Sequence, residues 1–442
     1  MTSSTLIDLR INNAEQFKES ISEPSPNTKM FLVFGKTNAW ANDAAPNTSN
    51  SSVSTVYEVW NNMIGGKRIL GGDLSHAIPR HDWTSGTIYS AYDNLRTDLH
   101  GTNTIFYVMN SDYSVYKCIA NNSGQQSTIQ PTSVNPDIIS ATGDGYSWKY
   151  MYTVSDSEKL RFVTDSYITV KTLSSDDGSL QWQVQDGAVN GSIDSIIVVN
   201  SGNNYTNVSN VTIAISGDGS SAAAQATLNS ITNTVSSITM TDRGSDYTYA
   251  TVTITDAGVA ANATARAIIS PPGGHGSDAT YELGGKNIII NTKLKYDEDS
   301  VLPTTNDYRQ IAILKDPYLR LTSTVAVNIA FVQALTVVCD GVGDFSEDEI
   351  VYQGSSQALA TFTGTVVSWT SSTSNLLLIN TTGTPTITQS VIGTTSFTSR
   401  VITSTLNGTL EKHSGKLLYV DNIKPITRSS DQIEDFQIVF TF

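Results

Sequence analysis

The sequence predicts a mainly β protein with a few short helices. Thr, Ser, Val, Ile, Tyr and Asn are abundant, whereas long runs of Glu, Lys and Leu are missing. Short apolar runs are separated by Gly- and Asn-rich turns, a pattern typical of sandwiches and barrels. The C-terminus alternates strictly and places Phe436, Ile438, Phe440 and Phe442 on one side of a strand. A buried aromatic strand at a terminus needs earlier partners, so we expect it to be clamped between earlier parts of the chain. This predicts a discontinuous core formed by both chain ends, with inserted β-sandwich or barrel domains.

Composition disfavours several classes of protein. The 442 residues correspond to about three domains of ordinary size. The net charge is −15 and the basic residues are not clustered, which is the opposite of the balance expected for a nucleic-acid binder or an anionic-membrane binder. Cys118 and Cys339 lie far apart in apolar stretches. This spacing predicts two buried free thiols rather than a disulfide framework or a metal site.

Targeting signals are not visible in the chain. The N-terminal sequence MTSSTLIDLRINNAEQF lacks a basic region followed by an apolar core, so no secretory signal is expected. The longest apolar run, Val325–Cys339, contains Asn328 and Gln333 and is too short to cross a bilayer. We therefore expect a soluble protein made in the cytoplasm.

The first 95 residues predict one strand and two helices. An Asn-capped helix is expected at 12–22, and the apolar run 30–34 predicts a strand that is buried on both faces. The polar segment 41–54 is expected to be a surface loop. From Ser54 onward, the apolar spacing is that of one helix face, which Gly65 and Gly66 should end; its members are Val56, Val59, Trp60, Met63 and Ile64.

Two stretches between 96 and 175 predict a small β domain. Residues 104–119 have the pattern of a hairpin around an Asn-Ser-Asp turn. Residues 143–154 predict an aromatic strand in which Tyr146, Trp148, Tyr150 and Tyr152 occupy alternate positions.

Residues 191–269 contain an internal repeat. Gly202 corresponds to Gly244 and Tyr205 to Tyr247, and each copy ends in alternating Ala. The Gly allows a tight bend over which the Tyr can pack back. We therefore expect two copies of one small β unit, stacked or paired.

The last third of the chain predicts further strands. The sequence PPGGHG at 271–276 marks a boundary between domains. Strands are expected at 287–296 and 308–317, and the β-rich block at 336–408 predicts a small barrel or sandwich. An apolar run follows at 416–420, with turn residues at 422–425 and 428–431 before the closing strand.

Catalytic and metal-binding sets do not rise above background in the sequence. His76 and His81 lie near Asp73 and Asp82, but Pro79 breaks any helix and the spacing matches no zinc site. The acidic run 340–349 lacks the order of a calcium loop and is better interpreted as a solvated turn. The Gly-rich segment 216–221 lacks the Gly-Lys-Ser/Thr ending of a phosphate loop and predicts a turn. Carboxylate pairs for glycoside cleavage stay open, because they converge only in three dimensions.

Five tyrosines leave a second binding function open. They could line a sugar platform, although packing at turns and strand edges is the commoner use of Tyr in β chains; they are Tyr89, Tyr92, Tyr205, Tyr247 and Tyr249.

Three stretches together resemble a known family. They are FLVFGKTNAW (31–40), AIPRHDW (77–83) with the helix before it, and HSGKLLYVDN through FQIVFTF (413–442); GDGYSWKYMY (143–152) and YRQIAIL (308–314) fit the same pattern. In this order they are similar to the baseplate wedge protein of T-even-type contractile-tailed bacteriophages, the product of gene eight. The resemblance covers the first 175 residues or so, about 280–320, and the C-terminus.

The resemblance implies a structural virion protein of a myovirus tail, without catalytic residues, metal or cofactor. It implies a homodimer in each wedge that bridges neighbouring wedge proteins during assembly and host-triggered rearrangement, in a virion made in the host bacterial cytoplasm. It also implies that the blocks at about 176–270 and 336–408 are insertions relative to a shorter prototype. The alternative from another class is a carbohydrate-binding adhesin or tail-fibre module, which leaves glycan contact through the insertions open.

These observations predict six segments. They are a first core segment (1–95), an inserted small β domain (96–175), an inserted tandem β-repeat domain (176–270), a second core segment (271–335), an inserted β barrel or sandwich domain (336–408), and the core closing strands (409–442).

Overall fold

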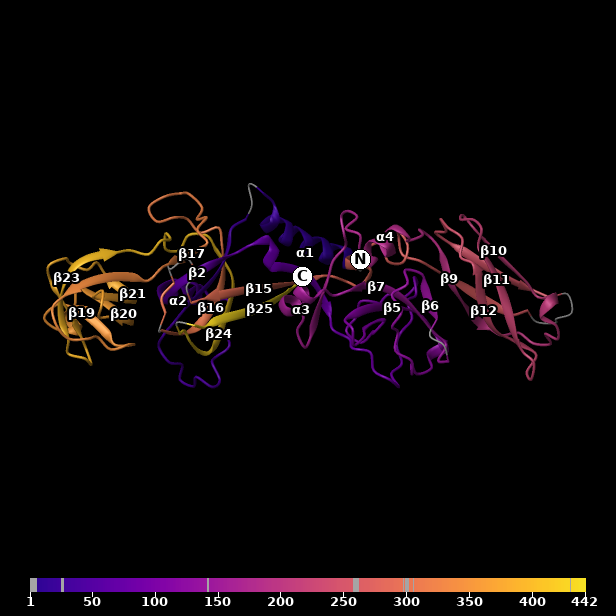
Figure 1. Ribbon diagram of the computed structural model, residues 1–442, viewed down its shortest axis with the longest axis horizontal. Coiled ribbons are helices and arrows are strands. Elements are labelled where there is room, and N and C mark those ends of the chain that lie inside the picture. Colours follow the sequence, from indigo (N-terminus) through magenta and orange to yellow (C-terminus); the bar gives the residue numbers. More distant parts are fainter. Residues whose placement is uncertain are drawn as a thin grey trace. The chain divides into compact units, whose positions relative to one another are not determined.

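Figure 1 shows the computed structural model, which describes residues 6–24, 28–140, 143–256, 262–296, 298, 302–304, 306–429 and 431–442. The chain forms two compact units, each assembled from separated segments. The first unit contains residues 1–16, 75–289 and 439–442, and the second contains 17–74 and 290–438. Helix α1 (Ile7–Ser22) and strands β15 (Asn287–Lys295) and β25 (Ile433–Thr441) each continue from one unit into the other.

A five-stranded sheet of the second unit draws on both ends of the chain. Its order is β17-β2-β1-β16-β24, with antiparallel pairing throughout. The strands are β1 (Met30–Gly35), β2 (Met63–Ile69), β16 (Asp307–Lys315), β17 (Ala330–Val332) and β24 (Lys416–Thr427). Every residue of β1 is buried, as its continuous apolar run predicts. Phe31 and Val33 share a core cluster with Leu314, Leu410 and Leu417, so the discontinuous core is confirmed.

Two helices differ from their predicted bounds. Helix α1 begins at Ile7, before the predicted Asn cap. Helix α2 (Val53–Asn62) is capped by the Ser52 side chain and ends before Gly65 and Gly66, which lie within β2 instead. A Cβ on Gly65 would lie 2.6 Å from the Phe331 carbonyl oxygen. This glycine therefore permits a close approach between strands rather than a helix end.

The closing strands also correct two predictions. Strand β24 continues through 422–425, where a turn was predicted, because Pro425 lies in an irregular stretch of an edge strand in which an N–H bond is not required. Strand β25 takes the edge position in the sheet β25-β15-β3-β8, which includes β3 (Leu74–Pro79) and β8 (Tyr167–Val170). It is therefore not clamped between two strands. Its inward face alternates as expected: Phe436 and Ile438 are buried, whereas Phe440 and Phe442 are half-buried.

The inward face of β25 begins with a charged group that the alternation does not reveal. Glu434 is 6% exposed and lies 3.4 Å from the Nε of Arg428, which is 1% exposed. The guanidinium of Arg428 also lies over the ring of Phe34. This buried pair ties the last strand to the five-stranded sheet in the absence of a second strand partner.

A four-stranded sheet forms the small β body of the first unit, in the order β4-β5-β7-β6. The predicted hairpin at 104–119 corresponds to β4 (Tyr107–Met109) and β5 (Ser114–Asn121), and the predicted aromatic strand to β7 (Tyr146–Thr153). The neighbouring elements are β3 (Leu74–Pro79), β6 (Ile138–Ser140), β8 (Tyr167–Val170), α3 (Asp156–Phe162), α4 (Leu180–Asp186) and α5 (Ala279–Glu282).

The internal repeat forms one six-stranded sheet in which the two copies exchange strands. Its order is β10-β13-β14-β9-β12-β11, so the last strand of each copy pairs with the first strand of the other. The first copy contains β9 (Ile193–Asn200), β10 (Thr212–Gly217) and β11 (Ala223–Asn229); the second contains β12 (Thr234–Asp242), β13 (Ala250–Thr255) and β14 (Thr264–Ile269). The sheet is rose-coloured in Figure 1.

The exchange extends to the predicted Gly and Tyr pairs. Gly202 and Gly244 both have positive φ, 63° and 60°, and Tyr205 and Tyr247 are 1% and 5% exposed. The hydroxyl of Tyr205 accepts from the N–H of Ala263 in the second copy, and that of Tyr247 from Ala222 in the first copy. The two copies are therefore interlocked rather than stacked.

The block predicted at 336–408 forms a closed barrel in the order β18-β21-β20-β19-β22-β23. Its strands, orange to yellow in Figure 1, are β18 (Leu335–Asp340), β19 (Ile350–Gln353), β20 (Phe362–Thr370), β21 (Asn375–Gly383), β22 (Ser390–Gly393) and β23 (Ser399–Leu406). The fold is thus mainly β with short helices, as predicted. The six-segment division stays a prediction, because the two units combine several of those segments.

Candidate functional site: a buried charge network

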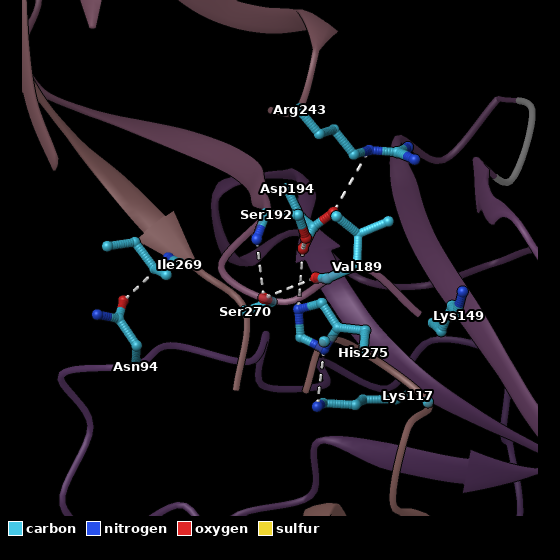
Figure 2. A network of polar contacts seen from close by, with 12 residues as sticks. Asn94, Lys117, Lys149, Val189, Ser192, Asp194, Arg243, Ile269, Ser270 and His275 are labelled. Atoms are coloured by element: carbon cyan, nitrogen blue, oxygen red, sulfur yellow. Dashed lines mark hydrogen bonds and ion pairs between the residues drawn. The ribbon is translucent and has the colours of Figure 1, made fainter. Parts of the chain in front are cut away.

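Four segments of the first unit meet in a network of charged side chains that are almost inaccessible to solvent (Figure 2). Lys117 lies on β5 and Asp194 on β9. His275 lies in the connector PPGGHG (271–276), and Glu282 ends α5. Their side chains are 0%, 3%, 3% and 1% exposed, respectively. The network therefore lies where the repeat sheet joins the small β body.

The connector PPGGHG brings His275 into this junction. Gly274 and Gly276 have φ of +96° and +95°, a conformation that side chains rarely adopt. A Cβ on Gly274 would lie 2.5 Å from the Val189 carbonyl oxygen, and one on Gly276 would lie 2.4 Å from a methyl of Val184. The glycines thus let the chain pack tightly on α4 and the residues after it. The segment lies between the repeat sheet and α5 and is packed within the first unit, so its interpretation as a boundary between domains stays a prediction.

Lys117 and Glu282 form the centre of the network. Lys117 Nζ lies 2.6 Å from Glu282 Oε2 and 4.2 Å from the centroid of the Tyr92 ring. Glu282 Oε1 accepts hydrogen bonds from the backbone N–H groups of Gly276 and Asp278. Because both carboxylate oxygens and the ammonium have partners, the pair can stay ionised away from water.

His275 links this pair to the repeat sheet. Its Nδ1 lies 2.9 Å from Lys117 Nζ. Since an ammonium can only donate, Nδ1 accepts and the ring proton stays on Nε2. That nitrogen lies 3.2 Å from Asp194 Oδ2, and Asp194 Oδ1 lies 3.4 Å from the Nε of Arg243 at the end of β12. With a neutral imidazole, two cations balance two carboxylates.

Hydrogen bonds from hydroxyl and backbone groups reinforce the same junction. The Ser192 hydroxyl donates to Asp194, and the backbones of Ser192 and Ser270 are joined by an N–H to carbonyl bond of 2.8 Å. Asn94 accepts from the N–H of Ile269. In Figure 2, dashed lines join the His275 ring to Asp194 and Lys117, and the pair Asn94 and Ile269 is drawn to the left of the ring. The repeat sheet is therefore held by paired charges within a shell of ordinary hydrogen bonds.

The charges shift the pKa values of both carboxyl groups. Burial alone would raise the pKa of Glu282, but the charge of Lys117, its hydrogen bond and the neighbouring His275 outweigh burial and lower the pKa to about 2. Burial likewise opposes ionisation of Asp194, but His275, Ser192 and Arg243 together lower its pKa. Both groups therefore remain carboxylates at neutral pH.

Two hollows of the first unit border the network. One has a volume of about 520 Å³ and is lined by Lys149, Asp194, Arg243 and His275 among others. The second, of about 880 Å³, is lined by Tyr92, Lys117 and Glu282 among others. The four network side chains bond to one another across the wall between these hollows. The arrangement is thus suited to holding two bodies together rather than to attacking a substrate.

The histidines and acids weighed as a metal site have other roles. His76 is buried with Nδ1 2.8 Å from the Gly285 carbonyl oxygen, His81 packs on the Tyr107 ring, and Asp82 pairs with Arg80. Asp73 accepts from the N–H of Leu70. Among the described residues, His, Cys, Asp and Glu side chains do not form a group of three or more that could hold a metal ion.

The acidic run 340–349 is not wholly a solvated turn. Asp340 and Asp344 are exposed as predicted, but Glu349 is 4% exposed and accepts several hydrogen bonds. The Gly-rich segment 216–221 is a turn, as predicted, in which Asp218 accepts from the N–H groups of Thr248 and Tyr249. Glu349 and Asp218 thus stabilise their loops by accepting hydrogen bonds, a role that their sequence context does not reveal.

The tyrosines weighed as a sugar platform are mostly interior. Tyr89, Tyr92, Tyr205 and Tyr247 are 2%, 7%, 1% and 5% exposed, whereas Tyr249 is 61% exposed. Interior packing therefore accounts for four of the five, with Tyr92 packed on Lys117. Both cysteines are free and buried, as predicted. None of the helices in the described part of the chain is long and apolar enough to cross a membrane.

Sequence reasoning did not single out the members of the network. They lie at positions 117, 194, 275 and 282, and their convergence depends on strand exchange in the repeat. One local signal is the pair of glycines around His275 in PPGGHG, a segment interpreted from the sequence as a boundary between domains. A charged residue inside an otherwise apolar strand, such as Lys117 in SVYKCI, is the other signal that could have been used.

Two comparisons find that this chain is similar to a phage baseplate protein. The family described as Bacteriophage T4, Gp8 matches residues 3–131. The baseplate wedge protein gp8 of Enterobacteria phage T4 is 25% identical over 207 residues, covering 37% of this chain and 62% of the relative. This chain resembles a baseplate wedge protein. The resemblance predicted from the sequence is confirmed.

The similarity to the wedge protein is partial in both directions. The chain spans about three fifths of the length of the curated relative it matches, 62%. The family match ends at residue 131, within the small β body, and includes β1, α2 and β5. It therefore covers Lys117 but stops before His275, Glu282 and Asp194. The identification of the later blocks as insertions stays a prediction.

Proposed function

We propose that this chain is a structural component of the baseplate wedge in a contractile phage tail, located in the virion and made in the cytoplasm of the host bacterium. The similarity to the T4 wedge protein gp8 over 207 residues is the observation that carries this proposal. The paired and buried state of the charge network supports a role without catalysis. Its charged side chains are paired with one another, which fits a role in stabilising the first unit.

The proposal includes a homodimer that bridges neighbouring wedge proteins. A baseplate must hold one arrangement and then change once on host contact, and packed interfaces suit that task because they change in steps rather than continuously. Permanent contacts of this type typically bury about 2,000 Å² or more. The acidic surface of the chain, with a net charge of −15, favours neighbours that present basic groups.

Sedimentation of the purified full-length chain tests this function. We expect a dimer of twice the 47.5 kDa chain mass, and binding to one or more separately purified tail proteins of the same phage. A chain that stays monomeric and binds none of these proteins would refute the wedge assignment. Tracing the chain in a density map of the intact tail would then show where in the particle it lies.

A further inference from the structure

One end of the barrel presents two large apolar side chains to solvent. Val342 and Phe397 are 87% and 82% exposed. They lie in the loops 340–346 and 393–399, which we call the barrel tip. The loops are adjacent, because the Thr398 hydroxyl donates to the Asp344 carbonyl oxygen over 2.7 Å and the Nε of Arg400 donates to that of Gly343, also over 2.7 Å. The exposed pair therefore belongs to one surface.

A buried carboxylate holds the barrel tip in place. Glu349 Oε2 accepts from the backbone N–H groups of Thr395 and Ser396, each over 3.0 Å. Glu349 Oε1 accepts from the Ser396 hydroxyl and the Ser346 N–H, each over 2.7 Å. One carboxylate thus joins both loops. Charge-assisted bonds of this kind are stronger than neutral ones, so the tip is ordered before any partner arrives.

Phe397 is displayed in an unfavourable backbone conformation. Its φ is +57°, in the left-handed region that costs a non-glycine residue free energy. The bonds from Glu349 to the two residues before it over-determine this turn. A folded chain gains no stability from an exposed ring held in this way. Ordered aromatic side chains of low conformational freedom are typical anchors in protein interfaces.

The base of the tip is rigid. Trp369 Nε1 donates to Asp344 over 2.7 Å, and its ring centroid lies 5.3 Å from that of Phe345. The guanidinium of Arg400 lies 4.5 Å from the Trp369 centroid and is largely buried, since Arg400 is 7% exposed. Arg400 therefore packs on Trp369 and contributes little positive charge to the exposed surface. Asp340 and Asp344, by contrast, are exposed, so the rim presented to a partner is acidic.

The charge of the tip selects the kind of partner. The tip of a second copy carries the same acidic rim and would meet this one unfavourably, as would nucleic acids and anionic membranes. We propose that the barrel tip docks Phe397 and Val342 into an apolar pocket, bordered by Lys or Arg, on another protein of the same tail. This rests on the proposed function, because it names the kind of neighbour that a wedge component would bind.

Binding measurements on full-length variants test the docking. The wild-type chain is titrated against each separately purified tail protein of the same phage in biolayer interferometry. We expect Phe397→Ser to lower the affinity for one of them at least tenfold, Val342→Ser to lower it less, and Glu349→Gln to lower it by loosening the turn. The matched control is Leu359→Ser, a residue of the same barrel that is 72% exposed and outside the tip, and it should bind like the wild type.

Salt sharpens the result. Raising NaCl from about 50 to about 500 mM should weaken wild-type binding, because exposed charges are screened, and Asp340→Asn should reduce this dependence. Thermal unfolding of each variant confirms that it is folded. Equal affinities of wild type, Phe397→Ser and Val342→Ser for every tail protein would overturn the docking while leaving the wedge function intact. Self-association that is lost in Phe397→Ser would also overturn it, in favour of a second copy. If the wild type binds none of the tail proteins, the wedge function itself fails.

Discussion

The repeat sheet and the barrel are attached to the rest of their own units by different chemistry. The repeat sheet joins the small β body through Lys117, Glu282, His275 and Asp194, all charged or ionisable and almost fully buried. The two chain segments that connect the barrel to the five-stranded sheet are clamped together by a neutral amide, since Gln333 Nε2 donates to the Leu410 carbonyl oxygen and Gln333 Oε1 accepts from the Leu410 N–H. The charge network can therefore lose or gain protons, whereas the Gln333 amide does not titrate.

The comparison shows what each joint tolerates. A buried ion pair gains little over an apolar contact but costs a great deal when one partner is lost. The Gln333 amide bonds to the backbone N–H and carbonyl oxygen of Leu410. Its removal costs less free energy, because only uncharged groups are left unpaired. Removing one partner should therefore destabilise the attachment of the repeat sheet more than removing the Gln333 amide destabilises that of the barrel.

The largest expected effect is that of Glu282→Ala. The substitution leaves Lys117 buried without its carboxylate, so we expect the free energy of unfolding of the first unit to fall by about 3–5 kcal/mol. Urea unfolding, with limited proteolysis to locate the loosened part, measures it. A loss below about 1 kcal/mol would show that the network does not hold the joint.

Acid should weaken the charged joint. The pKa of Glu282 is depressed from its ordinary 4.5 to about 2, so its contribution is fully present above pH 4.5 and is lost as the pH falls toward 2. At about 1.4 kcal/mol per pKa unit, this loss is on the order of 3 kcal/mol. Urea unfolding between these pH values should show a smaller decrease for Glu282→Gln than for wild type. Parallel curves would contradict the assignment.

Removing the neutral clamp should have a smaller effect that does not vary with pH. Gln333→Ala leaves the buried N–H and carbonyl of Leu410 unpaired, which costs about 1–3 kcal/mol. The same urea series measures it in the second unit. If the loss grew as the pH fell through the range where Glu282 titrates, the contrast between the joints would be wrong.

The smallest effect is expected at an exposed ion pair of the first unit. Asp156 pairs with Lys159 at 2.9 Å, and its side chain is 97% exposed. Because water and salt screen such a pair, Asp156→Ala should change the free energy of unfolding by less than about 1 kcal/mol. It is the matched control for Glu282→Ala. A loss comparable to that of Glu282→Ala would mean that burial does not decide the cost.

Local patterns predicted the elements that depend on local geometry. The apolar run of β1, the alternating aromatics of β7 and the Gly and Tyr pairs of the repeat were all recognisable, because period and backbone freedom are written into neighbouring residues. The predictions at Gly65 and at 422–425 were wrong because the same residues can end a helix, break a strand or admit a close neighbour. Only the neighbouring strand decides between these roles.

By itself the sequence determined the β class, the discontinuous core and the resemblance to a wedge protein, because the hydrophobic period and the order of the motifs are properties of the sequence. The tertiary structure alone decided that the two repeats exchange strands, that Lys117 meets Glu282 across the chain, and that Glu349 organises the loops that present Phe397. These contacts join residues that are distant in the chain. A buried charge is stable only when it is paired or hydrogen-bonded. Since these partners come from distant parts of the chain, only the fold shows the role of each charged residue.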